Sequence, residues 1–262
     1  MIRLKNKMIT TGNKKTVISH LEDLRFVFIR SLIYIIAASA VSFFFADKII
    51  DIIKLPSKDI ITGFYILKPT DSVAIYFKTI MYGAFVAAFL PVMYEIVNFI
   101  RPAFQKEQFS FIIKWTVFSM FLFVIGTLFV YFAVLPVSVK FLIGLANSLT
   151  PTGSQVSFNA YISFVLMLLL CGGITFQIPL ICAVLTMVNL ITPFMLSKFR
   201  KEIFFGLCVF AAVITPTTDV FSMILFVVPM ILLYEVGIII SSAVYKNKTA
   251  EIDKIYDGAK YD

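Results

Sequence analysis

Few side chains in this sequence could carry out catalysis or bind a metal ion. His20 is the only histidine, and the three cysteines, Cys171, Cys182 and Cys208, all lie inside apolar stretches. A His-based metal site or a catalytic triad requires more partners than these residues supply. The sequence also lacks the GxxxxGK motif of a P-loop, so it carries no P-loop of its own for nucleotide hydrolysis. We therefore expect no enzyme activity, no cofactor and no metal centre.

The remaining candidates are carboxylates and one amide placed beside or inside apolar stretches. They are Asp23 in SHLEDLR, Glu107 in NFIRPAFQKEQ, Gln177 in GGITFQIPL and Asp219 in TPTTD. Two of these stretches have a simple structural alternative: Ser19 and Glu22 match a capping box, and Glu107 matches a solvated loop charge. The Gln177 amide could pair with a partner helix or with a helix of its own bundle. The sequence leaves these alternatives open.

The composition places most of the chain in lipid. Of the 262 residues, 60% are hydrophobic and 15% are charged, with a mean hydropathy of +0.95. A soluble domain has roughly 45–50% apolar and about 25% charged residues. The pattern predicts an all-α membrane protein, since helices satisfy their own backbone hydrogen bonds in a bilayer. A net charge of +8 then reports orientation and contact with anionic lipid headgroups, and we expect no nucleic-acid partner.

Six apolar segments predict six transmembrane helices. They are Phe26–Ala46, Val73–Ile96, Phe111–Leu135, Phe158–Val188, Ile203–Ile214 and Val220–Ser241. The fifth would cover only about 18 Å of a hydrocarbon core of roughly 30 Å, and Glu235 shortens the lipid-exposed length of the sixth. The polar turn Thr215–Asp219 between them should therefore lie below the normal outer surface. We expect a six-span domain over residues 19–241, with tails at 1–18 and 242–262.

The distribution of Lys and Arg predicts which side each loop faces. The two tails and the loops on their side carry 17 of these residues, whereas the loops on the other side carry five. Under the positive-inside rule both termini lie in the cytoplasm. Within the spans, Lys78 can snorkel outward, while Glu95 and Glu235 are close enough to the inner ends for solvation at the interface.

Three features are predicted on the outer side. In DKIIDIIKLP (Asp47–Pro56) helical spacing gathers the isoleucines on one side, which favours a short interfacial helix that stops before Pro56. A helical extension of the first span is the alternative. Thr70 or Asp71 can cap the second span, and the polar segment Gly144–Ser157 is expected to be a surface loop.

Several motifs in order resemble the TatC family, the multi-spanning receptor of the twin-arginine translocase. They are HLEDLR, PTD…K, NFIRPAF, GTLFVYFAVLP, GGITFQIPL and TPTTDVFS…P…LYE, spread over about Ser19–Ser241. The resemblance implies a concave bundle with two short C-terminal spans that reads signal peptides carrying paired arginines. It also implies TatA-like and TatB-like single-span partners, folded cargo, energy from the proton gradient and a homo-oligomer in the bacterial cytoplasmic membrane.

The same resemblance implies a signal-peptide site on the cytoplasmic side. Asp23 falls on the acidic position of the first motif, Arg25 on its arginine, and Phe99 on the loop aromatic. A carboxylate suits this role because it accepts bidentate hydrogen bonds from a guanidinium. The loop glutamate falls on Gln108 by strict count, whereas Glu107 is the nearest acid and the one we favour.

Three further positions carry implied roles. Gln177 stands where the family has an intramembrane glutamate, so it is the expected contact with a partner helix. Asp219 matches the acidic residue of the outer turn, and Pro56 matches a proline of the first outer loop. Met223 replaces a glutamine, which predicts weaker polar contacts there.

Two other functions remain as alternatives. A small-molecule secondary transporter would need a polar midplane site and repeat symmetry, and the sequence shows neither. An intramembrane enzyme would need a nucleophile or metal set at membrane depth, and no Ser–His, paired Asp or HExxH arrangement is present.

Overall fold

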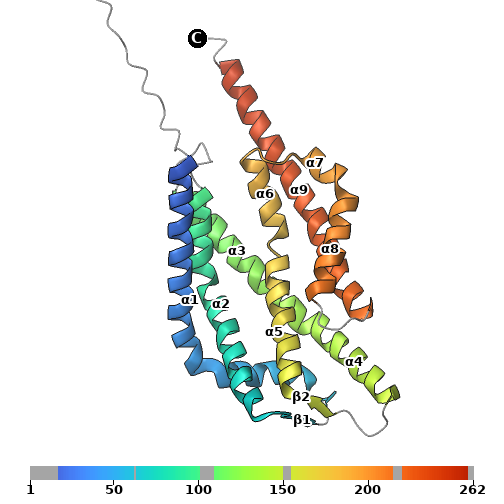
Figure 1. Ribbon diagram of the computed structural model, residues 1–262. Helices are drawn as coiled ribbons and strands as arrows, with labels where there is room; N and C mark the ends of the chain where they lie inside the picture. The colour runs from blue at the N-terminus through green and yellow to red at the C-terminus, as the bar shows by residue number, and fades with distance from the viewer. Residues whose placement is uncertain (1–16, 62, 101–108, 150–154, 215–219, 259–262) are drawn as a thin grey trace, which may run out of the picture.

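The computed structural model describes residues 17–61, 63–100, 109–149, 155–214 and 220–258, and its elements are almost all helical (Figure 1). In chain order the elements are α1 (Val17–Lys54), η1 (Leu55–Ser57), β1 (Gly63–Tyr65), α2 (Pro69–Ile100), α3 (Phe109–Phe129), η3 (Val130–Val134), α4 (Leu135–Leu149), β2 (Gln155–Ser157), α5 (Phe158–Thr175), α6 (Ile178–Met187), α7 (Pro193–Lys198), α8 (Arg200–Ile214) and α9 (Val220–Gly258). The expected all-α class is confirmed.

The helices run up and down between two ends of the molecule. The start of α1 and the end of α9 lie at one end, which we call the termini end, and β1 and β2 lie at the other, the strand end (Figure 1). The end of α8 and the start of α9 lie well short of the level of the strand end (Figure 1). The turn Thr215–Asp219 between these two helices lies outside the described residues.

Five stretches in the described part of the chain are long and apolar enough to cross a membrane. They are Glu22–Ser57, Pro69–Ile100, Ile113–Ser148, Phe158–Met187 and Met223–Lys246. The helix at the predicted fifth span, α8, has 15 residues and is about 22 Å long, shorter than a hydrocarbon core of roughly 30 Å. The last helix differs from the expectation of a short span, because its apolar stretch of 24 residues is long enough to cross.

The amphipathic segment after the first span is continuous with α1, so the alternative of a helical extension is the correct one. Figure 1 shows the last part of α1 turning across the strand end of the bundle. Ile53 is buried there, and the carbonyls of Ile52 and Ile53 accept hydrogen bonds of 2.8 Å from the hydroxyls of Tyr131 and Tyr161. The end of α1 therefore packs against the bundle while remaining part of the same helix as the first span.

The described parts of the predicted surface loop Gly144–Ser157, on either side of residues 150–154, form regular structure. Helix α4 continues to Leu149, and β2 pairs with β1 in parallel, with Phe64 opposite Val156. The Phe64 ring lies 5.0 Å from the rings of both Phe158 and Tyr161. The ribbon therefore ties the segment before α2 to the start of α5.

Helices α3 and α5 approach each other through glycines. A Cβ atom added to Gly126 would lie 2.7 Å from the carbonyl oxygen of Gly172, so no larger residue fits without a shift. The α5 face around this contact forms the core, where Ile162, Val165 and Leu168 are almost fully buried. Beyond the contact, η3 is a single π-helical turn, which joins α3 to α4 without ending the helix.

Candidate functional site

Three of the predicted signal-peptide residues lie at the termini end. Asp23 is half-buried and Arg25 exposed on α1, and Phe99 is half-buried in the last turn of α2. Because α1 begins at Val17, Ser19 lies inside the helix and the capping-box interpretation is wrong. Glu107 and Gln108 lie outside the described residues.

An ion pair joins α1 and α2 close to these residues. The Arg30 guanidinium donates to Glu95 Oε2 at 3.4 Å, and the Tyr34 hydroxyl donates to Glu95 Oε1 at 3.3 Å. The Glu95 side chain is only 7% exposed, whereas that of Arg30 is 57% exposed. The expectation that Glu95 is solvated at the interface is wrong, because α1 covers it.

Helical spacing links the ion pair to the predicted site. Asp23 and Arg30 are seven residues apart, so they share one face of α1 about 10 Å apart along its axis. Glu95 and Phe99 are four residues apart and share one face of α2. We call these residues, together with Tyr34, the α1–α2 seam. It contains two carboxylates, a cation and two aromatic rings on the facing sides of α1 and α2.

A second Arg–Glu pair joins α8 and α9 near the same end. Arg200 donates to Glu235 Oε2 at 2.8 Å, and both side chains are more than a third exposed. Glu235 thus keeps some access to solvent, in line with its expected solvation, but it also has a cationic partner.

At the strand end, Lys78 does not snorkel as predicted. Its Nζ atom donates to Asn159 Oδ1 at 2.8 Å and to Ser163 Oγ at 2.7 Å, both on α5. Asn159 in turn donates to Asp71 Oδ1 at 3.0 Å. The charge of Lys78 is therefore held between α2 and α5 by uncharged groups, with the Asp71 carboxylate one step away.

The predicted helix caps near the strand end are partly confirmed. Asp71 Oδ2 accepts a hydrogen bond of 3.1 Å from the Lys68 backbone N–H, so its carboxylate satisfies a donor at the start of α2.

Helix α1 ends at Lys54, before Pro56, as expected, and Pro56 is half-buried in η1. Asp219 lies outside the described residues.

Gln177 lies at a break between α5 and α6 that the sequence did not predict. Its Oε1 atom accepts from Ser119 Oγ at 2.7 Å, and its Nε2 atom donates to the Ser119 carbonyl at 3.1 Å. The side chain is buried, and Pro179 follows in the first turn of α6. Both ends of the amide are therefore bonded to α3, which is the alternative of a contact within its own bundle.

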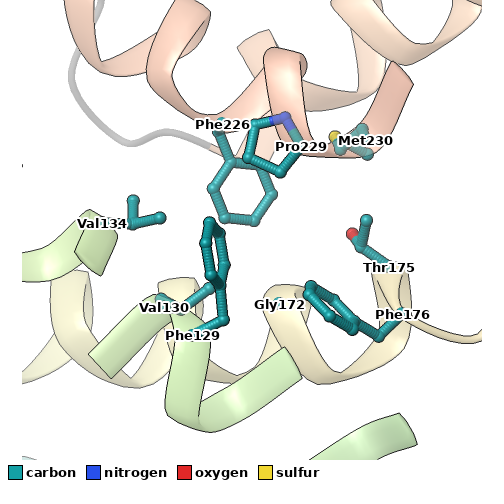
Figure 2. Close-up of a pocket in the computed structure, with 9 residues that line it drawn as sticks. All are labelled: Phe129, Val130, Val134, Gly172, Thr175, Phe176, Phe226, Pro229 and Met230. Atoms are coloured by element: carbon teal, nitrogen blue, oxygen red, sulfur yellow. The ribbon is translucent and has the colours of Figure 1, made fainter. Parts of the chain in front are cut away.

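Two cavities of the described bundle have mainly apolar walls. The smaller, about 10 Å³, lies between α3, η3, α5 and α9 (Figure 2). The side chains of Phe129 and Phe226 reach into it from different elements, and it has room for no more than about one water molecule. The larger, about 160 Å³, is lined by α2, α3 and α6, with Trp115 among aliphatic side chains. Neither resembles the polar midplane site that a secondary transporter requires.

Comparisons with known proteins identify the family. The chain matches the family described as Sec-independent protein translocase protein (TatC) over residues 19–229. It is 34% identical over 241 residues to the Sec-independent protein translocase protein TatC of Aquifex aeolicus, which covers 90% of this chain and 98% of the relative. The chain belongs to the TatC family.

Other TatC proteins extend the similarity to both sequence and fold. The TatC protein of Escherichia coli K12 is 30% identical over 238 residues, covering 89% of this chain and 90% of the relative. A crystal structure titled twin arginine translocase receptor TatC has a TM-score of 0.78 and 34% identity, covering 86% of this chain and 99% of that chain. The resemblance noted in the motifs is confirmed, and the chain is a TatC-family membrane protein.

Sequence reasoning missed the partners of Glu95 and Lys78 in this TatC-family chain. The sequence spacing of both residues could have indicated their importance. Glu95 lies one helical turn before Phe99, and Lys78 lies two turns after Asp71 on the same face of α2. Charges at membrane depth that share a face with other functional candidates are functional candidates themselves.

Proposed function

We propose that this chain is the receptor and core subunit of a twin-arginine translocase, which exports folded proteins across the bacterial cytoplasmic membrane. The observation that carries the proposal is its similarity, over 86% of its length, to a crystal structure titled twin arginine translocase receptor. In this proposal the chain binds signal peptides without being an enzyme, and the proton gradient drives transport. Both termini lie in the cytoplasm.

The proposed signal-peptide site is the termini end of α1 and α2 with the loop that follows. Asp23 and Glu107 accept the guanidinium groups of the arginine pair, because carboxylates bind arginine bidentately. Phe99 packs against the peptide, and Arg25 and Gln108 complete the polar lining. The half-burial of Asp23 and Phe99 supports this role, since a partly desolvated carboxylate interacts more strongly with a cation.

The proposed partners are TatA-like and TatB-like single-span subunits, lipids and further copies of the chain. Gln177 is the proposed contact with a partner helix. Since its amide is bonded to Ser119, such a partner would have to exchange with these bonds. Pro56 and Asp219 are assigned to the outer face, where Pro56 follows the end of α1.

The test of the carboxylate site is peptide binding to a double variant, Asp23→Ala with Glu107→Ala, in the full-length chain. Binding of an Arg–Arg signal peptide should fall by a factor of about ten or more, as expected for the loss of charge-assisted hydrogen bonds. Arg3→Ala in the N-terminal tail is the control and should leave binding unchanged. Equal losses in both variants would contradict the assignment.

A further inference from the structure

Glu95 is a buried carboxylate with incomplete hydrogen bonding. Its two partners in the described part of the chain contact it at 3.4 Å and 3.3 Å, whereas charge-assisted hydrogen bonds are typically about 2.7–2.9 Å. An ionised carboxylate offers about four acceptor positions. Glu95 therefore retains capacity for a shorter, bidentate arginine contact.

The arginine that pairs with Glu95 is itself largely exposed. The Arg30 side chain is 57% exposed, so its guanidinium can be hydrated if it leaves the carboxylate. Tyr34 would still donate to Oε1 on the same side of the contact. Arg30 thus occupies Glu95 as an internal arginine that an incoming one could replace.

The position of Glu95 fits a peptide bound along the α1–α2 seam. Phe99 lies one turn further along the same face of α2, and Asp23 lies about 10 Å from Arg30 along α1. Neighbouring side chains of an extended peptide point to opposite sides, so two adjacent arginines need two separated acceptors. The seam supplies carboxylates at two such levels.

We infer that Glu95 is a specificity-determining residue of the signal-peptide site, and that one arginine of the signal displaces Arg30 from it. This inference rests on the proposed function. The exchange replaces one guanidinium with another, so no net charge is buried or exposed. A lysine cannot reproduce the planar, bidentate contact, so Glu95 discriminates between Arg–Arg and Lys–Lys.

The first test is Glu95→Gln, which keeps the size of the side chain and removes its charge. The full-length variant in lipid nanodiscs is titrated with synthetic signal peptides carrying Arg–Arg or Lys–Lys. Arg–Arg binding should weaken roughly tenfold or more, and the ratio of Arg–Arg to Lys–Lys affinity should fall with it. Glu235→Gln, which breaks the other Arg–Glu pair, is the matched control and should keep both the affinity and the ratio.

The second test is Arg30→Gln, which removes the internal competitor. A purely structural ion pair predicts weaker peptide binding, because the seam would loosen. Displacement predicts the opposite: Arg–Arg binding tightens by roughly three- to tenfold, since the site no longer has to be vacated. The peptide should also raise the melting temperature of Arg30→Gln by more than that of the parent.

The possible outcomes distinguish a failure of the inference about Glu95 from a failure of the proposed receptor function. If the parent discriminates between the peptides but Glu95→Gln discriminates equally well, the inference is overturned and the proposed receptor function stands. Weaker Arg–Arg binding by Arg30→Gln also overturns the inference. If the parent itself binds both peptides equally, the proposed function fails and the inference with it.

Discussion

The two Arg–Glu pairs near the termini end join different helices and differ in both length and burial. Arg200 and Glu235 lie 2.8 Å apart, with both side chains more than a third exposed. Arg30 and Glu95 lie 3.4 Å apart, with a carboxylate that is almost fully covered. The Arg–Glu pair with the shorter N···O distance is therefore the more exposed one.

This difference separates an exposed link between two helices from the carboxylate of the inferred binding site. An exposed pair at short distance competes with water and contributes little, typically about 0–1 kcal/mol. A buried carboxylate is costly to leave unpaired, and the long contact of Glu95 fits the inferred exchange of Arg30 for an arginine of the signal peptide. The α1–α2 pair is thus suited to exchange, whereas the α8–α9 pair only links two helices.

The largest expected effect on stability follows from removing Arg30. Among the described residues, Arg30→Gln leaves Glu95 with its hydrogen bond to Tyr34, and we expect a loss of about 1–3 kcal/mol in the free energy of unfolding. Arg200→Gln should cost about 1 kcal/mol or less. Thermal unfolding of both variants in detergent, without peptide, measures the difference. Equal melting temperatures for Arg30→Gln and Arg200→Gln would contradict the claim that the two ion pairs differ in their contribution to stability.

A third charge extends the comparison to the strand end. Lys78→Met leaves the Asn159 and Ser163 oxygens without their cationic donor and Asp71 without a nearby positive charge, so we expect a loss of about 1–2 kcal/mol. The control is Lys140→Met on α4, where the lysine is exposed and the effect should be close to zero. A loss no larger than that of the control would show that Lys78 is solvated after all.

Gln177 tests whether a buried polar contact also serves a partner. Gln177→Leu removes the two bonds to Ser119, and we expect a cost of roughly 1 kcal/mol together with reduced co-purification of TatA-like and TatB-like subunits. Ser119→Ala, which removes only the hydroxyl bond, should lower stability and leave partner binding intact. Normal co-purification with Gln177→Leu would assign the residue a structural role alone.

The smallest effect is expected at a neutral contact between α6 and α9. The hydroxyls of Thr186 and Ser241 lie 2.6 Å apart, and Thr186 also bonds the Cys182 carbonyl. Thr186→Val keeps the shape and should cost about 0.6 kcal/mol, the average for such bonds in membrane proteins. Thr186→Ser should be close to the parent. A loss above that of Arg30→Gln would reverse the ranking of charged over neutral contacts.

The helices were predictable from the sequence because apolar length alone decides whether a segment can cross a bilayer. Their ends were less predictable. The turn of α1 across the strand end does not change the helical periodicity of the sequence, so periodicity could not predict it. The pairing of β1 with β2 joins segments far apart in the chain, which local sequence patterns do not show. The break before α6 could not be predicted from the spacing of residues within one helix, because the Gln177 side chain at the break is bonded to a different helix, α3.

The candidate site was predictable in part. Motif order gave Asp23, Arg25 and Phe99, and the structure brings α1 and α2 together beside them. It also revealed Glu95 and Lys78 as paired, because the partner of a charge at membrane depth lies on another helix. Reading each span alone therefore assigned both residues to the interface, where solvation was a sufficient explanation.

The most direct test of the receptor function uses a photo-crosslinking residue at Phe99 in the full-length chain. An Arg–Arg signal peptide should crosslink there, and a Lys–Lys peptide should crosslink far less. The same residue at Phe132, an exposed position on η3, is the control and should capture neither peptide. Absence of crosslinking at Phe99 with both peptides, in a folded protein with its partner subunits present, would contradict the assignment of this surface as the signal-peptide site.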